Sequence, residues 1–500
     1  MFDSYASLMT IRRKIFKEVA KLGYEGGDYK RVDEIPYKLF RGQPVYRESI
    51  FLERAIAGER IRLALGLSTR HADEHLPISV GIEEAVTDEK FYEPPLINII
   101  DFACNACPEE SYFVTNVCEG CLARPCTNVC PKEAIKIVDG RSFINQELCI
   151  KCGKCSDVCP FKAIQHRQRP CAKACGVNAI ESDEYGKAKI NYDKCVSCGQ
   201  CLVNCPFGAI ADKSQIFQVI QAIKSETPVY AIFAPAFVGQ FGPKVNLKTI
   251  SAAVKELGFE DAIEVSIGAD LCTIQEAHDF LENVPEKLKF MGTSCCPSWS
   301  TMVKKEFPEL RDNISMSLTP MVLTARLVKK EHPNSKIVFI GPCSSKKLEA
   351  SRKSVRSDVD FVLTFEELMG MFEAKEVDFA KLPQAELKNE TSADGRGFAV
   401  AGGVAQAVVN ACKTIAPDRE IKVESAQGLA NCKKLIENAK KGKYDGYLLE
   451  GMACPFGCVS GAGTISSPTR GKSMVFASQR ETTLKNSVES KYKDKLPELD

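Results

Sequence analysis

The sequence of 500 residues predicts a mostly helical region over residues 1–100, an α+β region of cysteine-rich repeats over residues 101–212, and an α/β domain over residues 213–500. Three observations predict this division. The first hundred residues contain no cysteine, whereas sixteen of the 24 cysteines lie between Cys104 and Cys205. After residue 212, apolar strand-like runs alternate with helical ones, a pattern typical of parallel sheets covered by helices on both faces.

Bulk properties exclude several classes of protein. A formal net charge of +1 gives no reason to expect nucleic acid or an anionic membrane as a partner. The first residues lack the basic and apolar segments of a signal peptide, and no run approaches the roughly 18 apolar residues of a membrane span. We therefore expect a soluble, cytoplasmic protein. In such a chain, 24 cysteines indicate metal binding rather than disulfides.

The N-terminal region shows helical periodicity but no chemistry of its own. In residues 46–64, Ile50, Arg54 and Ile61 fall on one face at helical spacing. His71 and His75 are four residues apart, but no third ligand accompanies them. We expect a solvated helix end there rather than a metal site.

The cysteine-rich region repeats itself. Residues 149–159 and 195–205 share the spacing C-x2-C-x2-C-x3-C followed by proline; residues 118–130 contain two extra residues, and residues 171–175 contain half a run. In bacterial ferredoxins, three close cysteines bind one cubane and the fourth reaches its neighbour. These runs resemble two such ferredoxin units in tandem.

Crossed ligation distributes sixteen cysteines over four 4Fe-4S clusters. The expected sets are Cys118, Cys121, Cys126 and Cys159; Cys149, Cys152, Cys155 and Cys130; Cys195, Cys198, Cys201 and Cys175; and Cys104, Cys107, Cys171 and Cys205. In a competing partition, Cys205 completes the set of residues 149–155, Cys159 completes that of residues 195–201, and residues 171–175 belong to an insertion. Zinc is a further alternative for Cys104 and Cys107.

The α/β domain brings three cysteine motifs to strand ends. The expected strands are residues 229–233, 262–265, 337–340 and 446–449, and the expected helices are residues 247–257 and 272–281. Sites in parallel sheets form beyond the carboxyl ends of the strands. The motifs are Thr-Ser-Cys-Cys-Pro-Ser-Trp at residues 293–299, Gly-Pro-Cys-Ser-Ser-Lys-Lys-Leu-Glu at 341–349, and Glu-Gly-Met-Ala-Cys-Pro-Phe-Gly-Cys at 450–458.

Four cysteines of these motifs suffice for one further cubane. Cys296, Cys343, Cys454 and Cys458 can each provide the terminal thiolate that one iron needs. Cys295 is then left over. A thiol beside a ligand, not needed for coordination, can carry protons instead.

Together, the three motifs resemble the signature motifs of the iron-iron hydrogenases. In that family they bind the H-cluster, a cubane bridged through a cysteine to a two-iron subsite with carbonyl, cyanide and dithiolate ligands. The resemblance covers about 290 residues and implies a two-lobed catalytic domain with the cluster between its lobes. It also implies reversible reduction of protons to H2, with ferredoxin or a similar redox protein as the partner.

The resemblance assigns a proton route. Cys295 matches the family's relay cysteine, Glu276 and Asp279 match its two glutamates, and Ser315 matches its serine. Asn283 stands where the family has an outer arginine. Glu276 and Asp279 are three apart on the expected helix and therefore share a face. Their spacing alone would favour a solvated face.

The resemblance also assigns residues around the cofactor. Lys346 matches a lysine that binds a cyanide ligand, and an ammonium is a strong donor to an anion in a poorly solvated pocket. Ala234, Pro235 and Met452 match residues that line the cofactor, and Glu349 matches a carboxylate near the lysine.

Departures from the pattern indicate a divergent branch. Gly341 and Ala405 stand where familiar members have methionine, which predicts a roomier pocket. A hydrogen or redox sensor that retains the H-cluster is an alternative function, but Cys295 argues against it. An iron-sulfur assembly factor is another, against which the complete motif set argues. No dinucleotide fingerprint is present, so nicotinamide would have to bind another chain.

Overall fold

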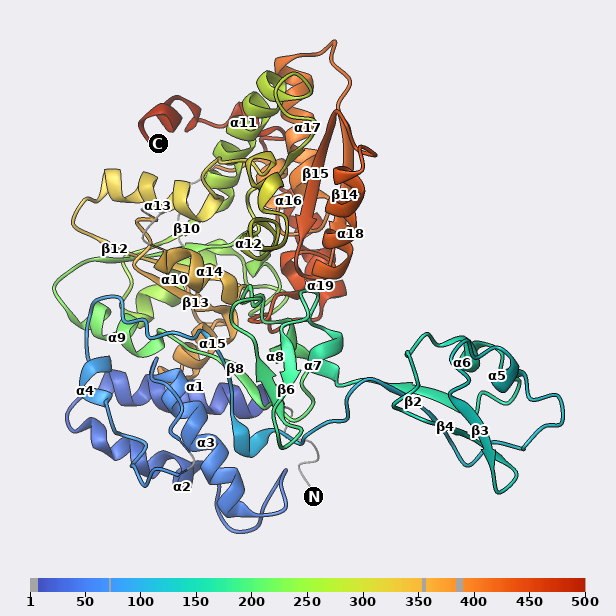
Figure 1. Cartoon of the computed structure of the whole chain (residues 1–500). Helices are drawn as coiled ribbons and strands as arrows, with labels where there is room; N and C mark the ends of the chain where they lie inside the picture. Colours follow the sequence, from blue (N-terminus) through green and yellow to red (C-terminus); the bar gives the residue numbers. More distant parts are fainter. Residues whose placement is uncertain (1–7, 72, 353–356, 384–389, 500) are drawn as a thin grey trace.

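The computed structural model describes residues 8–71, 73–352, 357–383 and 390–499. The view in Figure 1 shows a large body and a small unit that stands apart from it. None of the helices in these ranges has both the length and the apolar character that a membrane crossing requires.

The N-terminal region is built of helices that pack against the α/β domain. They are α1 (Leu8–Glu25), α2 (Ile35–Leu39), α3 (Ile50–Ala64) and α4 (Ile82–Ala85). The apolar face of α1 lies on α9 (Ile216–Lys224) and α15 (Phe365–Ala374). The approach is close, because a Cβ on Gly370 would lie 2.5 Å from the Cβ of Phe16.

The α/β domain contains two parallel sheets. The first has the order β10 (Ala262–Glu264), β9 (Val229–Phe233), β12 (Lys336–Gly341) and β13 (Phe361–Thr364). The second has the order β11 (Met291–Gly292), β15 (Tyr447–Met452) and β14 (Lys422–Gln427). All pairings within these sheets are parallel. The expected strands and their parallel arrangement are confirmed.

Helices cover both sheets. They are α10 (Leu247–Leu257), α11 (Ser266–Asn283), α12 (Pro297–Glu306), α13 (Pro320–Glu331), α14 (Ser344–Ser351), α16 (Ala393–Gly397), α17 (Gly403–Ile415), α18 (Leu429–Lys440) and α19 (Pro468–Arg480). Helix α10 has the expected bounds. Helix α11 begins six residues before the expected start at Cys272. In this added segment, Gly268 allows α13 to pack closely, since a Cβ on it would lie 2.2 Å from the Pro320 oxygen.

The cysteine-rich region forms two units that are nested. The framing unit contains β1 (Ile97–Ile99), α7 (Pro170–Lys173), β6 (Ile180–Ser182), β7 (Ala188–Ile190), α8 (Gln200–Asn204) and β8 (Ile210–Asp212). The inserted unit contains β2 (Ser111–Val114), α5 (Pro125–Asn128), β3 (Ile135–Val138), β4 (Arg141–Ile144), α6 (Lys154–Asp157) and β5 (Ile164–Arg167). In each unit the first and last strands pair antiparallel.

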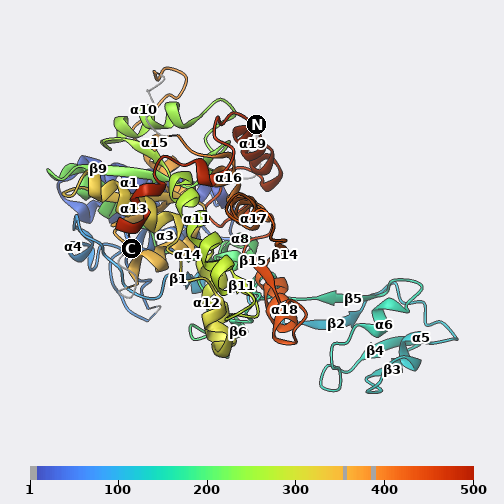
Figure 2. The same cartoon turned by 90° about the horizontal axis from the view of Figure 1, so that it is seen from above.

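The expected tandem order is therefore corrected. Strand β1 of the framing unit precedes the inserted unit in the chain, whereas its partner β8 follows it. The framing unit is completed when its first strand, β1, pairs with its last strand, β8. The inserted unit lies between these two strands in the sequence and is therefore nested within the framing unit. Figures 1 and 2 both show the inserted unit apart from the body, joined to it by a narrow neck.

The neck consists of the two segments of the chain that enter and leave the inserted unit. Arg169 binds them to the framing unit. It is buried, and its guanidinium donates to the carbonyl oxygens of Cys107 at 2.9 Å, Glu181 at 3.1 Å and Gly186 at 2.7 Å. Cys107 precedes the inserted unit, Glu181 lies in β6, and Gly186 lies in the turn between β6 and β7. One side chain thus fixes where the insertion enters and leaves.

Arg169→Ala should open the neck locally. Lost hydrogen bonds to a charged group cost roughly 1.5–3 kcal/mol each, so amide exchange over residues 105–110 and 180–190 should rise about tenfold or more. Hydrogen–deuterium exchange with mass spectrometry measures this. Arg167→Ala is the matched control, because its guanidinium contacts Ser111 and Phe113 within the inserted unit. Equal exchange in both variants would contradict the assignment.

Candidate functional site

A single cavity lies where strands of both sheets end. Cys295 and Cys296 follow β11, Cys343 follows β12, and Cys454 follows β15. All four line the cavity, together with Cys458. Carboxyl ends of parallel strands lie at one edge of a sheet, so motifs far apart in the chain meet there.

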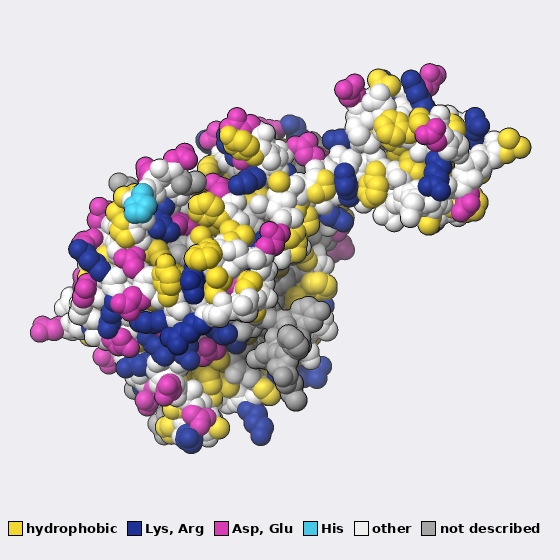
Figure 3. Space-filling view, turned by 90° about the horizontal axis from the view of Figure 1, so that it is seen from below, with side chains coloured by type: hydrophobic (Ala, Val, Ile, Leu, Met, Phe, Trp, Pro, Cys, Tyr) yellow, Lys and Arg dark blue, Asp and Glu magenta, His cyan; other side chains and the backbone are white. Residues whose placement is uncertain are grey.

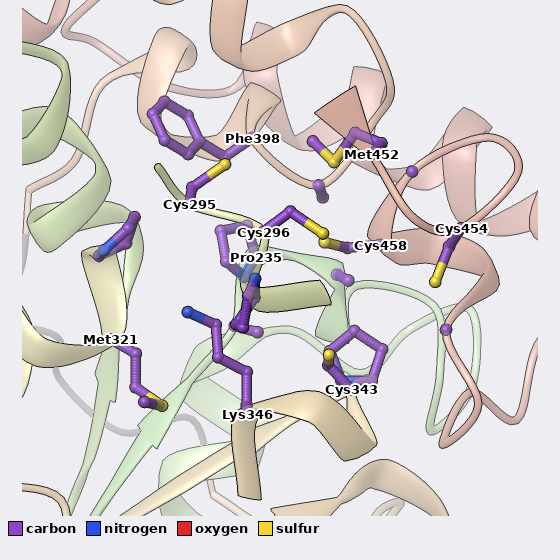
Figure 4. Close-up of a pocket in the computed structure, with 18 of the residues that line it drawn as sticks. Pro235, Cys295, Cys296, Met321, Cys343, Lys346, Phe398, Met452, Cys454 and Cys458 are labelled. Atoms are coloured by element: carbon purple, nitrogen blue, oxygen red, sulfur yellow. The ribbon is translucent and has the colours of Figure 1, made fainter. Parts of the chain in front are cut away.

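The two sides of the cavity are lined by different side chains, as Figure 4 shows. Cys343 and Cys454 lie on one side, with Cys296 and Cys458 near the middle. Cys295, Lys346 and Phe398 lie on the other side. Ala234, Pro235 and Met452, which the sequence assigns to the cofactor lining, also border the cavity. The structure therefore brings the expected ligands and lining residues together.

The four thiols are partly exposed to the cavity, and their low-polarity surroundings favour the neutral form over the thiolate. Burial raises the pKa of Cys343 to about 11 and raises those of Cys296, Cys454 and Cys458. A coordinated cation reverses this preference and binds the deprotonated thiolates. This donor set suits an iron–sulfur cubane.

Trp299 supports the motif from behind. It is fully buried, and its Nε1 donates to the Thr293 oxygen at 3.1 Å. A Cβ on Gly451 would lie 2.1 Å from Cδ2 of the Trp299 ring. The glycine before Met452 therefore allows the indole to lie against β15.

Lys346 places an ammonium at the cavity. Its Nζ forms an ion pair with Glu349 Oε2 at 2.7 Å, and Glu349 Oε1 accepts from Thr319 Oγ1 at 2.8 Å. Burial lowers the pKa of Lys346, but Glu349 and nearby thiols outweigh it, so the pKa is raised. Apart from the ion pair, the described residues offer Nζ no acceptor. A charged donor is thus available to an anionic ligand.

Glu276 lies behind the cysteine pair. It is fully buried, and its Oε1 accepts the main-chain N–H of Ser294 at 2.7 Å. Burial raises the pKa of Glu276 to about 7, although the hydrogen bonds from Ser294 lower it. Burial also raises the pKa of Cys295, with the nearby Glu276 charge as the next cause. A carboxyl with this pKa can hold or release a proton at neutral pH.

The outer part of the expected proton route contains a residue that the sequence assignment missed. Ser315 Oγ donates to Ser317 Oγ at 3.0 Å, and Ser317 Oγ donates to Asp279 Oδ2 at 2.9 Å. Asn283 Nδ2 donates to the Asp279 carbonyl oxygen at 2.7 Å. Ser317 thus links Ser315 to Asp279; the sequence signal was a second hydroxyl two residues after the first.

The accessory cysteines gather in groups. Cys104, Cys107, Cys171 and Cys205 line one pocket. Cys198, Cys195 and Cys175, and also Cys171 of the first group, lie near Cys201 and add to the effect of burial in raising its pKa. In the inserted unit, Cys130 and Cys149 lie near Cys155, and Cys118 and Cys126 both contact Ser142. No such thiol–thiol or shared serine contact among the described residues assigns Cys121, Cys152 or Cys159 to a cluster, so their places in the expected sets stay predictions.

One alternative for these cysteines, the competing partition, gains no support. The competing partition joins residues of the inserted unit to the framing unit, whereas α6 and α8 lie far apart in Figure 1. Within the described ranges, no three His, Cys, Asp or Glu side chains lie close enough to hold one metal ion. The four cysteines of the catalytic cavity do not meet this criterion either, so it does not decide between zinc and a cluster at Cys104 and Cys107, and the interpretation of His71 and His75 stays a prediction.

The expected enlargement of the pocket is not found at either substituted position. A Cβ on Gly341 would lie 2.5 Å from the ring of Phe339, which itself borders the cavity, so this ring occupies the space. Ala405 lies in a separate apolar cluster with Phe280 and Leu448. Neither Gly341 nor Ala405 is among the residues that line the cavity, and at Gly341 the Phe339 ring takes up the space.

Comparison with known families decides the relationship. Residues 227–462 match the family described as iron only hydrogenase large subunit, C-terminal domain. Residues 227–462 form a domain of the iron-only hydrogenase family. Residues 117–169 and 165–216 match the LdpA Fe-S cluster-binding domain, so iron–sulfur domains precede the hydrogenase domain in a divergent arrangement.

Curated relatives of the chain include hydrogenases and an iron–sulfur assembly component. It is 29% identical to iron hydrogenase 1 of Clostridium pasteurianum, over 74% of this chain and 73% of the relative. It is 30% identical to the periplasmic [Fe] hydrogenase large subunit of Nitratidesulfovibrio vulgaris, over 42% and 61%. It is also 25% identical to cytosolic iron-sulfur assembly component 3 of Bos taurus, over 46% and 59%.

The raised pKa of Glu276 predicts a pH-dependent stability. A carboxyl with an ordinary pKa near 4.5 and a folded pKa of about 7 stabilises the fold fully below about 4.5, and this contribution is lost as the pH rises through about 7. Thermal unfolding of Glu276→Gln should therefore change less between pH 5 and 8 than that of the unmodified protein.

Infrared difference spectra provide the matched control for this prediction. Glu276→Gln should lose a carboxyl band that titrates near pH 7. Burial also raises the pKa of Asp270 to about 7, and Asp270 binds Ser392 and Ser487 rather than Ser294. Asp270→Asn should therefore remove a different band. Persistence of both bands in Glu276→Gln would contradict the assignment.

Proposed function

We propose that the chain is an iron-iron hydrogenase that catalyses the reversible reduction of protons to H2. In this proposal, four 4Fe-4S clusters relay electrons between the H-cluster and ferredoxin or a similar redox protein. One observation carries the proposal: four cysteines, the spare Cys295 and the ammonium of Lys346 border the same buried cavity. A cubane alone would need neither of the last two groups.

The residues present fit the H-cluster. Cys296, Cys343, Cys454 and Cys458 would hold the cubane, and Lys346, which lacks an acceptor in the cavity, would donate to an anionic ligand of the two-iron subsite. Glu349 orients the ammonium through their ion pair. When bound, the H-cluster supplies the metal centre at which protons and electrons combine.

The protein's own contribution is proton transfer and exclusion of water. Cys295 lies at the side of the cavity where Lys346 is found and would exchange protons with the cofactor. Glu276 would exchange them with Cys295, because its pKa of about 7 makes both protonation states accessible. Ser315, Ser317 and Asp279 would continue the route outward through their hydrogen bonds.

Electrons would enter through the inserted unit. It projects from the body, and Figure 3 shows apolar side chains on its surface. Leu122 is 95% exposed and Ile150 is 55% exposed, each directly after a cysteine of a metal-binding run. Exposed apolar side chains beside the clusters suit the docking of a redox protein. We place the reaction in the cytoplasm, although one relative is named as periplasmic.

An iron–sulfur assembly role is the second candidate, favoured by the similarity to an assembly component. Infrared spectra of protein matured with the hydrogenase cofactor separate the two functions. We expect carbonyl and cyanide bands together with H2 evolution from a reduced dye. Cubane iron without these bands after complete maturation would favour the assembly role, and bands with only slow turnover would favour a sensor.

Cys295→Ala should lower H2 evolution by about 10²-fold or more, the contribution typical of a positioned proton-transfer group. The carbonyl and cyanide bands should persist, because Cys295 is not among the expected ligands. Cys412→Ala is the control: it removes another buried thiol, which lies in the apolar cluster of α17 away from the cavity. Full turnover in Cys295→Ala would place the proton route elsewhere.

A further inference from the structure

Gln200 connects two groups of cysteines. It lies two residues after Cys198, at the start of α8, and its Nε2 donates to Cys454 Sγ at 3.4 Å. Cys454 belongs to the four cysteines of the catalytic cavity, which Cys198 also borders. A residue from the framing unit therefore contacts the catalytic group directly.

The chemistry of the amide and the thiolate decides which group donates the hydrogen bond and which accepts it. A thiolate only accepts hydrogen bonds, so a neighbouring amide presents its N–H rather than its oxygen. Gln200 is 8% exposed, which leaves the contact poorly solvated. Hydrogen bonds to an ionised acceptor are roughly twice as strong as neutral ones.

The main chain of Gln200 contacts the neighbouring group. Burial raises the pKa of Cys198 to about 12, and the main-chain N–H of Gln200 opposes this by hydrogen bonding to the sulfur. Gln200 therefore donates its main-chain N–H to Cys198 and its side-chain N–H to Cys454. It joins one ligand of each group.

The surrounding loop holds Gln200 in place. Gly199 has φ +76°, and a Cβ on it would lie 2.5 Å from the Cβ of Ala462. The hydroxyls of Ser298 and Ser345, from two different motifs, both donate to the Val196 oxygen, at 3.2 Å and 3.3 Å. The loop is thus packed against the catalytic domain, and the amide of Gln200 stays directed at Cys454.

We propose that Gln200 raises the reduction potential of the cubane held by Cys296, Cys343, Cys454 and Cys458. Reduction adds negative charge that the thiolate sulfurs share, and a hydrogen bond to a sulfur stabilises this charge. The inference rests on the proposed function only in requiring a cubane at these four cysteines. Gln200 acts through Cys454, so it tunes the potential and takes no part in the chemical step.

The test is a redox titration followed by electron paramagnetic resonance. The full-length chain is reconstituted with iron and sulfide, without a two-iron subsite. The catalytic cubane is identified as the component that is lost or altered in Cys454→Ala. In Gln200→Met, which keeps the length of the side chain but not the donor, this component should shift to a lower potential. Gln200→Glu should shift it further, because the carboxylate adds negative charge.

Asn204→Ala is the matched control. Asn204 lies on the same helix, but its side chain donates to the Gln200 carbonyl oxygen, at 2.9 Å, rather than to a sulfur. It should leave the potential unchanged, and iron content equal to that of the unmodified protein shows that each variant has folded. Should Gln200→Met lose iron, Gln200→Glu decides the test.

The possible failures are distinguishable. An unchanged potential in Gln200→Met, or an equal shift in Asn204→Ala, would overturn the inference while leaving the proposed function intact. If Cys454→Ala, which supplies no ligand at this position, leaves every component unchanged, no cubane is held there, and the proposed function and the inference both fail. A shift of the expected sign in a chain that evolves no H2 would uphold the inference alone.

Discussion

The site depends on one constraint: the carboxyl ends of the parallel strands of both sheets lie at one cavity. Strands β9 and β12 of one sheet and β11 and β15 of the other all end at the same cavity. Residues that are far apart in the sequence, from Ala234 to Cys458, therefore line one site. Burial then raises the pKa of the thiols gathered there. A bound cation would offset this effect and favour the thiolates, so a site that disfavours free thiolates suits a metal cluster.

A second constraint ties the accessory region to this cavity. Lys347 Nζ lies 2.9 Å from Asp212 and 2.8 Å from Glu367, and all three side chains are buried. Asp212 ends β8 of the framing unit, and Glu367 belongs to α15. Removing one partner of a buried ion pair costs about 3–5 kcal/mol, because the other charge is left unpaired. This cluster therefore holds the framing unit against α14, the helix that also contains Lys346, and keeps the contact of Gln200 with Cys454 in register.

The sequence predicted correctly those features of the fold that depend on residues close together in the chain. Helix α10 has the bounds that its periodicity predicts, and each apolar run expected to be a strand is one. Prediction from the sequence failed where the cause was a distant neighbour. Gly268 looks unfavourable inside a helix, yet it is required where α13 passes, and Phe339 fills the space that Gly341 leaves. Ser317 enters the hydrogen-bonded chain only because α11 brings Asp279 beside it.

The sequence by itself determined the spacing of the cysteine runs, the residue types of the three motifs and the order of strands and helices. These follow from local periodicity and from the few chemistries that closely spaced thiols permit. Only the tertiary structure decided that one cysteine-rich unit is nested in the other, that Lys346 is buried against the cavity, and that Gln200 reaches Cys454. Such contacts depend on side-chain directions and on elements far apart in the chain, and neither is encoded in the pattern of any one segment.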